Sequence, residues 1–148
     1  MDAATQRVAA CCELILEVVR SKGEVRLKLF GTSMLPAVWP GDLVVVRCCV
    51  FGELQLGQII LHERAGALTA HRIVKILRNR LILRGDTVPQ CDPPVLATEV
   101  VGKVASVVRN GREISLRRRF AHRAVAFAVR RSSICRRMTL RLGSGLWV

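Results

Sequence analysis

Three side chains have the types and the order that nucleophilic catalysis requires. Ser33 follows Gly31-Thr32 at the end of an alternating apolar segment, His71 stands inside an apolar segment, and Asp92 lies in a loop rich in Gly, Pro and Asp. A hydroxyl nucleophile needs a base, and imidazole, with a pKa of about 6.5, takes and returns a proton at neutral pH. A carboxylate can hold that imidazole in the required tautomer.

Each of these residues has a common structural explanation when it is taken alone. A serine in a turn, a histidine in a strand and an aspartate in a loop usually serve the fold. It is the combination, with two of the three residues at strand ends or loops where sites are usually placed, that favours catalysis. We therefore interpret Ser33, His71 and Asp92 as a candidate nucleophile, base and orienting acid.

Short motifs around these residues resemble the boxes of signal peptidase I and its serine-peptidase relatives. GTSMLP at 31–36, followed by PGDLV at 40–44, is similar to the box that contains the nucleophile. HRIV at 71–74 is similar to the box of the general base. LRGD at 83–86, continuing to Asp92, is similar to the third box, and VGKV at 101–104 matches the strand that closes that region. The resemblance covers about residues 24–108.

The resemblance implies a role for each matched position. Ser33 is the nucleophile, Asp92 orients the base, and Asp86 supports the active-site loop. His71 is the base in place of the lysine of most bacterial signal peptidases, which is similar to the endoplasmic-reticulum type; Lys75 is the rival base. Further supporting residues of the serine box are Gly31, Met34 and Pro36, and any oxyanion donor at Gly31 would be a backbone group.

The implied activity is that of a serine endopeptidase that cleaves a leader or signal-type peptide, bound extended along a strand edge, with small side chains before the cleaved bond. No cofactor and no metal are implied, and no Cys/His cluster has zinc spacing. Two alternatives stay open. One is a self-cleaving regulator resembling LexA-type repressors, for which the first ~24 residues are too short to hold a DNA-binding domain. The other is a non-catalytic basic binding module of the same fold.

Apolar periodicity predicts a mainly β protein. A helix is expected over 5–20, ending at Lys22-Gly23, and a loop over 85–94. Asn110-Gly111 predicts a hairpin turn. The pattern thus predicts a compact β domain between two helical ends. The resemblance implies a signal-peptidase/LexA-like coiled β-barrel or sandwich, with an N-terminal helix (1–23), a peptidase domain (24–116) and a basic C-terminal helical tail (117–148). Strands of the domain are expected over 24–30, 43–50, 58–63, 68–77, 80–84, 100–108 and 113–116.

Most of the net charge of +13 belongs to the end of the chain. Residues 1–108 carry 13 basic and 10 acidic side chains, whereas residues 109–148 carry 11 arginines and one acid, Glu113. The tail arginines alternate with apolar residues and precede Trp147, a pattern that indicates an anionic membrane surface rather than nucleic acid. A helix packed on the domain is the simpler interpretation.

No segment has the length and composition of a membrane span or a secretory signal peptide. We therefore expect a cytoplasmic or peripherally membrane-associated protein. The six cysteines, Cys11, Cys12, Cys48, Cys49, Cys91 and Cys135, are interpreted as small buried hydrophobic residues in a reducing compartment rather than as a disulfide framework.

Overall fold

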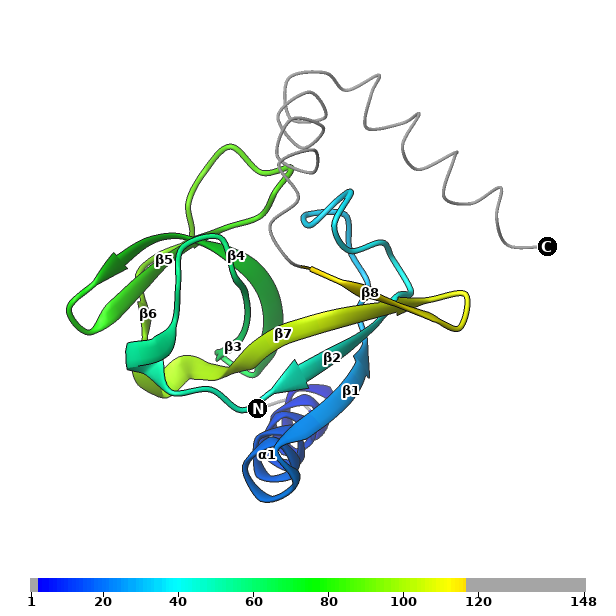
Figure 1. Ribbon diagram of the computed structural model, residues 1–148. Helices are drawn as coiled ribbons and strands as arrows, with labels where there is room; N and C mark the ends of the chain where they lie inside the picture. Colours follow the sequence, from blue (N-terminus) through cyan, green and yellow to red (C-terminus); the bar gives the residue numbers. More distant parts are fainter. Residues whose placement is uncertain (1–2, 117–148) are drawn as a thin grey trace.

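The computed structural model describes residues 3–116, with side chains from residue 10 onward (Figure 1). One helix precedes an antiparallel sheet of eight strands. In chain order the elements are α1 (Ala3–Lys22), β1 (Glu24–Lys28), β2 (Leu43–Arg47), the 3-10 helix η1 (Phe51–Glu53), β3 (Ile59–Arg64), β4 (Ala67–Leu77), β5 (Arg80–Arg84), β6 (Val95–Leu96), the 3-10 helix η2 (Ala97–Glu99), β7 (Val100–Arg109) and β8 (Arg112–Ser115).

The expected helix and the seven expected strands are all present, with ends shifted by a few residues. The strand expected over 43–50 ends early, at Arg47, and the chain then leaves the sheet through exposed Cys48. The loop over 85–94 and the turn at Asn110-Gly111 are where the sequence predicts them. The two-residue strand β6 was not predicted, because two residues are too few to show a periodicity.

The helix ends where the sequence predicts. Gly23 has φ +78°, which glycine adopts without steric cost, and its N–H donates to the carbonyl of Val19 at 3.0 Å. Cys12, Ile15, Leu16 and Val19 lie on the face that packs toward the sheet. This 3-4 spacing is that of an amphipathic helix, so α1 is held against β1, β4 and β7 by apolar burial.

The sheet is open, with strand order β1-β2-β7-β3-β4-β5-β6, and it is not closed into a barrel. The barrel of the expected architecture is therefore corrected. Strand β6 pairs only with β5, and it follows Pro93-Pro94, which have no N–H for a ladder. No pairing joins β6 to β1, so both end strands keep a free edge within the described residues.

Strand β7 organises the sheet. Strand β2 pairs along one edge, while β3 pairs with the first half and β8 with the second half of the strand (Figure 1). Register shifts in the β2–β7, β3–β7 and β4–β5 pairs bend the sheet at three places. The described residues form two apolar clusters, one against α1 and the serine loop, the other around Ile60, Ile73 and Leu83.

The expectation that the cysteines are buried holds for Cys12 alone among those the structure describes. Cys11, Cys48 and Cys91 are exposed and Cys49 is half-buried, and all five are free thiols. The apolar character of the sequence around 43–50 suggested burial, but the strand ends before the cysteine pair. Cys135 lies outside the described residues.

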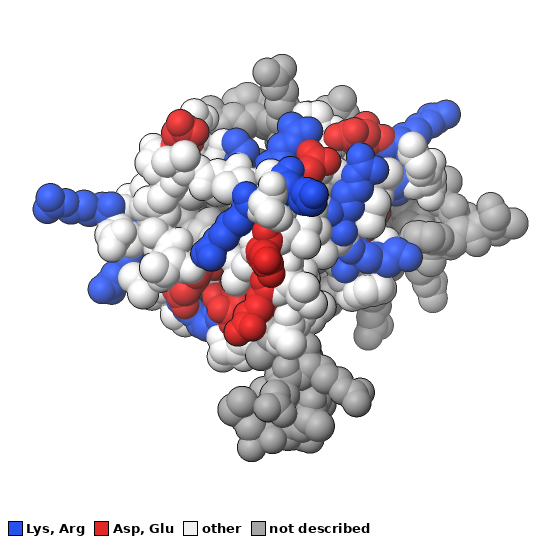
Figure 2. Space-filling model, turned by 90° about the horizontal axis from the view of Figure 1, so that it is seen from below, with Lys and Arg blue, Asp and Glu red and all other residues white. Residues whose placement is uncertain are grey.

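The expected helical tail, 117–148, also lies outside the described residues. On the face drawn in Figure 2, basic and acidic side chains of the described part are interspersed, as their near balance in the sequence implies. Of the helices in the described residues, none has both the length and the apolar character needed to cross a membrane.

Candidate catalytic site

Ser33, His71 and Asp92 lie in one hydrogen-bonded chain. The Oγ of Ser33 is 3.1 Å from Nε2 of His71, and Nδ1 of His71 is 2.5 Å from Oδ2 of Asp92. Ser33 comes from the loop before β2, His71 from β4, and Asp92 from the loop between β5 and β6. Three segments that are distant in the sequence therefore meet at the positions that the sequence analysis singled out.

The serine loop is anchored by the apolar residues that follow the serine. Met34 and Leu35 are buried, and the N–H of Val38 donates to the carbonyl of Met34 at 3.0 Å, which closes a turn. Ser33 itself is only half-buried. The motif thus places a buried residue directly after an accessible hydroxyl, so burial of Met34 and Leu35 fixes where that hydroxyl lies.

A second loop holds the serine from the other side. The N–H of Thr87 donates to the carbonyl of Ser33 at 2.9 Å, and the Thr87 hydroxyl donates to the carbonyl of Thr32 at 3.0 Å. Gly85 approaches so closely that a Cβ there would lie 2.9 Å from the Ser33 carbonyl oxygen. Only glycine permits this approach, which explains the residue type at position 85.

His71 is fixed by the sheet. It pairs with Ile60 of β3, and it is 8% exposed. On the same strand Arg72 points to the opposite face, as the alternation of a strand requires. A strand position gives the imidazole less freedom than a loop would, which suits a base that must face two partners at once.

The position of Asp92 is set by its own backbone N–H and by the ion pair that holds Asp86 in the same loop. The N–H of Asp92 donates to the carbonyl of Leu83 at 2.8 Å. Arg72 donates to both carboxylate oxygens of Asp86, at 2.7 and 2.6 Å, and to the carbonyl of Gly57 at 2.7 Å. Bidentate guanidinium–carboxylate pairs fix orientation as well as charge. Asp86 therefore ties the loop to β4 through Arg72.

The other supporting residues lie around Ser33. Gly31 is exposed and has φ +133°, a conformation that disfavours other residues. Pro36 is half-buried. Lys75, the rival base, is exposed and lies beyond the register shift between Ile73 and Lys75.

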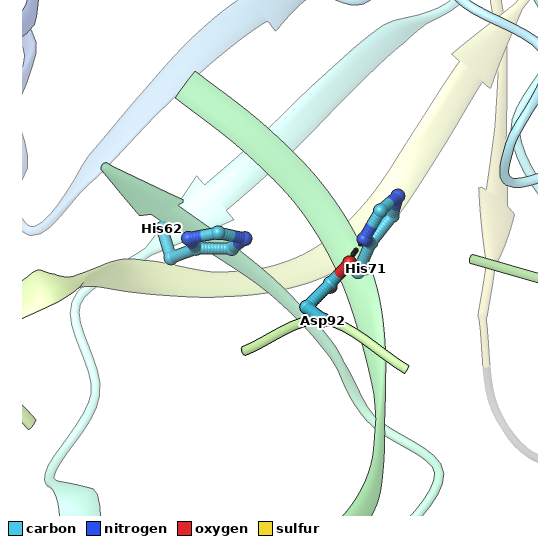
Figure 3. Close-up of side chains that lie close together, drawn as sticks. All are labelled: His62, His71 and Asp92. Atoms are coloured by element: carbon cyan, nitrogen blue, oxygen red, sulfur yellow. Dashed lines mark hydrogen bonds and ion pairs between the residues drawn. The ribbon is translucent and has the colours of Figure 1, made fainter. Parts of the chain in front are cut away.

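His62 joins the site although it was not predicted. Its ring centroid lies 6.5 Å from that of His71, and one ligand atom each of His62, His71 and Asp92 lie within 4.8 Å of one another (Figure 3). The hairpin register could have revealed it. Because Ala65-Gly66 turns the chain, Arg64 pairs with Ala67, and His62 and His71 then fall on the same face of adjacent strands.

His62 has an unusual environment. It is 5% exposed, and neither ring nitrogen has a hydrogen-bond partner among the described residues. Burial lowers the pKa of the His62 imidazole below its ordinary value, and the nearby carboxylate of Asp92 opposes this shift only in part. A buried polar group without a partner is rare in a folded protein and calls for a physical explanation.

Neither comparison with known proteins gives a relative: no family model matches the sequence, and no curated protein matches it. What the site can do is therefore argued from its geometry. A hydroxyl, an imidazole and a carboxylate in this order can activate the hydroxyl as a nucleophile.

Proposed function

We propose that the protein is a serine endopeptidase resembling signal peptidase I, with Ser33 as nucleophile, His71 as general base and Asp92 as the acid that orients it. The observation that carries the proposal is the hydrogen-bonded chain from Ser33 Oγ through both ring nitrogens of His71 to Asp92. The likeness of the motifs at 31–36, 71–74 and 83–92 to the signal peptidase boxes, and the mainly β fold, support it.

In this mechanism the Nδ1–H of His71 donates to Asp92, which leaves Nε2 as the acceptor of the Ser33 proton. Ser33 Oγ attacks the peptide carbonyl carbon while its proton passes to Nε2, and a tetrahedral intermediate forms. The intermediate collapses to an acyl-enzyme, and His71 gives the proton to the leaving amine. Water, deprotonated by His71, then hydrolyses the ester and restores Ser33.

The substrate would be a leader or signal-type peptide, bound extended along a free strand edge with small side chains before the cleaved bond. Backbone hydrogen bonding of such an edge tolerates many sequences, so specificity would come from pockets for alternate side chains. The basic tail would hold the enzyme at an anionic membrane face, close to its precursor.

Labelling with a fluorophosphonate, located by mass spectrometry on the full chain, tests the nucleophile. The adduct is expected on Ser33 and is expected to be lost in Ser33→Ala and His71→Ala. Ser115→Ala, which removes an exposed serine of β8, is the matched control and keeps the adduct. Cleavage of a peptide library with small residues before the scissile bond is measured in parallel.

Asp92→Asn is expected to lower the cleavage rate by about 10³–10⁴-fold, because a neutral amide no longer selects the tautomer with the proton on Nδ1. Full cleavage by Ser33→Ala would overturn the proposed mechanism. Vesicle binding without any hydrolysis would instead favour the non-catalytic basic module.

A further inference from the structure

His62 is a buried polar side chain near the site for which the catalytic scheme has no use. Both of its ring nitrogens are buried and unpartnered in the part of the chain that the structure describes. Figure 3 shows its imidazole projecting from β3 toward His71 and Asp92, with a ring nitrogen on the side that faces them. A buried ring N–H donor and ring nitrogen acceptor without partners lower the free energy of unfolding unless something else binds to them.

We propose that His62, His71 and Asp92 form a binding site for a divalent transition-metal ion, Zn²⁺ in the first place, and that occupancy of this site switches the catalytic chain off. The binding itself needs only these three side chains. The inhibition rests on the proposed function, since it acts by taking the base away from Ser33.

The donor set fits zinc. Two imidazole nitrogens and one carboxylate oxygen, with an open fourth position, are ligands that Zn²⁺ takes in proteins, at about 2.0–2.2 Å each. Tetrahedral ligand atoms at that distance are about 3.3 Å apart. Here the three ligand atoms lie within 4.8 Å of one another, so small rotations of the side chains bring them to an ion.

The sheet predisposes this geometry. His62 and His71 stand on adjacent strands of a regular hairpin, and Asp92 is fixed by its N–H bond to Leu83. Arg64, the nearest fully charged cation on β3, is engaged by Glu99 at 2.8 Å and by the carbonyl of Pro94 at 2.7 Å. These partners direct its guanidinium toward η2 and leave the carboxylate of Asp92 for the histidines.

Binding would inactivate the site by a defined exchange. The nitrogen of His71 that faces Asp92 is Nδ1, since Nε2 faces Ser33. Binding requires the other neutral tautomer: the Nδ1 proton leaves to solvent, Nε2 takes a proton from solvent, and Zn²⁺ binds the lone pair that is freed on Nδ1. The hydrogen bond between His71 and Asp92 is replaced by one bond from each side chain to the metal. With its proton on Nε2 and the metal on Nδ1, His71 has no lone pair left to accept the proton of Ser33.

Metal binding is measured first, on the full-length Ser33→Ala protein, so that the result is independent of catalysis. Co²⁺ is added as the spectroscopic probe and Zn²⁺ is titrated against it. The expected result is one tightly bound ion per chain with the visible absorption of tetrahedral Co²⁺ and without the charge-transfer band of thiolate ligands. That band would assign the ion to the cysteines and overturn the proposal.

The ligand set is tested with variants in the same background. His62→Asn is expected to weaken Zn²⁺ binding by roughly tenfold or more, and Asp92→Asn, which replaces a partly exposed side chain, to weaken it similarly. His122→Asn removes the remaining histidine of the chain as the matched control and leaves the affinity unchanged. Equal affinities of the Ser33→Ala protein and both ligand variants would refute the site.

Inhibition is measured on the active protein, as the loss of peptide cleavage or of Ser33 labelling when metal is added. Each rate is compared with the metal-free rate of the same protein. Zn²⁺ is expected to inhibit, and a chelator to restore the rate; Mg²⁺, which prefers oxygen ligands, is the control cation. Activation by Zn²⁺ would overturn the switch. If Ser33 proves unreactive while Zn²⁺ still binds through His62, the peptidase proposal fails and the metal site stands.

Discussion

At the scale of single residues, the site depends on one close backbone contact. Gly85 and Ser33 belong to loops that reach the same point from different parts of the sheet. A Cβ on residue 85 would meet the carbonyl oxygen of Ser33 at 2.9 Å and both Ser33 Cβ and a methyl group of Val88 at 3.0 Å. Real Cβ atoms do not come so close to backbone, so a side chain at 85 must displace the serine loop.

Gly85→Ala is therefore expected to lower the rate of cleavage and of Ser33 labelling by about 10–100-fold, because Ser33 Oγ is moved from Nε2 of His71. Gly52→Ala is the control: a Cβ at Gly52 has nothing within 4 Å, and its φ is not positive. If both variants keep the wild-type rate, the contact at Gly85 does not position the nucleophile.

The residues of the candidate site were largely readable from the sequence. Ser33, His71 and Asp92 were identified by type and order, and the structure brings their side chains together. The clamp between Arg72 and Asp86 was not predicted in detail, because a pairing between a strand and a loop needs the loop's path. His62 was missed because its role appears only once the hairpin register places it beside His71.

At the scale of elements, Arg64 connects β3 to the chain around η2. Its guanidinium donates to both carboxylate oxygens of Glu99 at 2.8 Å and to the carbonyls of Pro93 and Pro94 at 3.3 and 2.7 Å. The hydrogen bond from Arg64, together with the N–H of Leu96, lowers the pKa of Glu99 from 4.5 to about 2. The end of the Asp92 loop is thereby fastened to β3.

A depressed carboxyl pKa stabilises the fold above the ordinary value of 4.5, and this contribution is lost as the pH falls toward 2. Glu99→Gln is expected to lower the free energy of unfolding at pH 7 by about 0.5–1 kcal/mol, since the pair is partly exposed to solvent. Urea unfolding at pH 7 and near pH 2 checks this: the difference between wild type and variant should shrink at the lower pH. Glu53→Gln, an exposed acid of η1, is the control, and an undiminished difference at low pH would contradict the argument.

The elements were predicted better than their ends. Alternation defined β1, where Val25 and Leu27 face inward and Arg26 and Lys28 outward. The apolar run over 43–50 gave no such boundary, because a continuous run does not show where pairing stops. Here pairing with β1 and β7 stops at Arg47.

At the scale of the whole molecule, one buried carboxylate connects the serine box to the far end of β7. Asp42 is 2% exposed, and Arg109 donates to it from Nε at 3.0 Å and from Nη2 at 2.5 Å. The N–H of Trp39 donates to the same carboxylate at 2.7 Å, and the guanidinium of Arg109 lies 5.5 Å from the centre of the Trp39 ring. The aspartate of the Gly41-Asp42 pair in the motif thus joins the segment that follows the serine loop to the end of β7.

Arg109→Leu is expected to lower the free energy of unfolding by about 3 kcal/mol, because it leaves the carboxylate of Asp42 buried without its countercharge. Urea unfolding followed by circular dichroism measures the change. Arg112→Leu, at an exposed position of β8, should stay within about 0.5 kcal/mol of wild type. Equal midpoints for the two variants would show that Asp42 does not depend on Arg109.

The overall architecture was predictable to the level of a mainly β protein with an N-terminal helix, but of the coiled β-barrel or sandwich that was expected, the barrel was wrong because the sheet does not close. Closure depends on how the end strands meet, and the sequence does not encode this locally. Pro93-Pro94 and the short β6 end the sheet before it returns to β1.

The assembly of the candidate site from three separate segments has a consequence for how the protein loses its function. A loop can detach from a sheet at a small fraction of the free energy of global unfolding. Either the serine loop or the Asp92 loop, on detaching, would break the chain of hydrogen bonds while the strands remain paired. Activity would then be lost before the protein unfolds. The rate of catalytic turnover would report the free energy that holds the two loops against the sheet rather than the free energy of global unfolding.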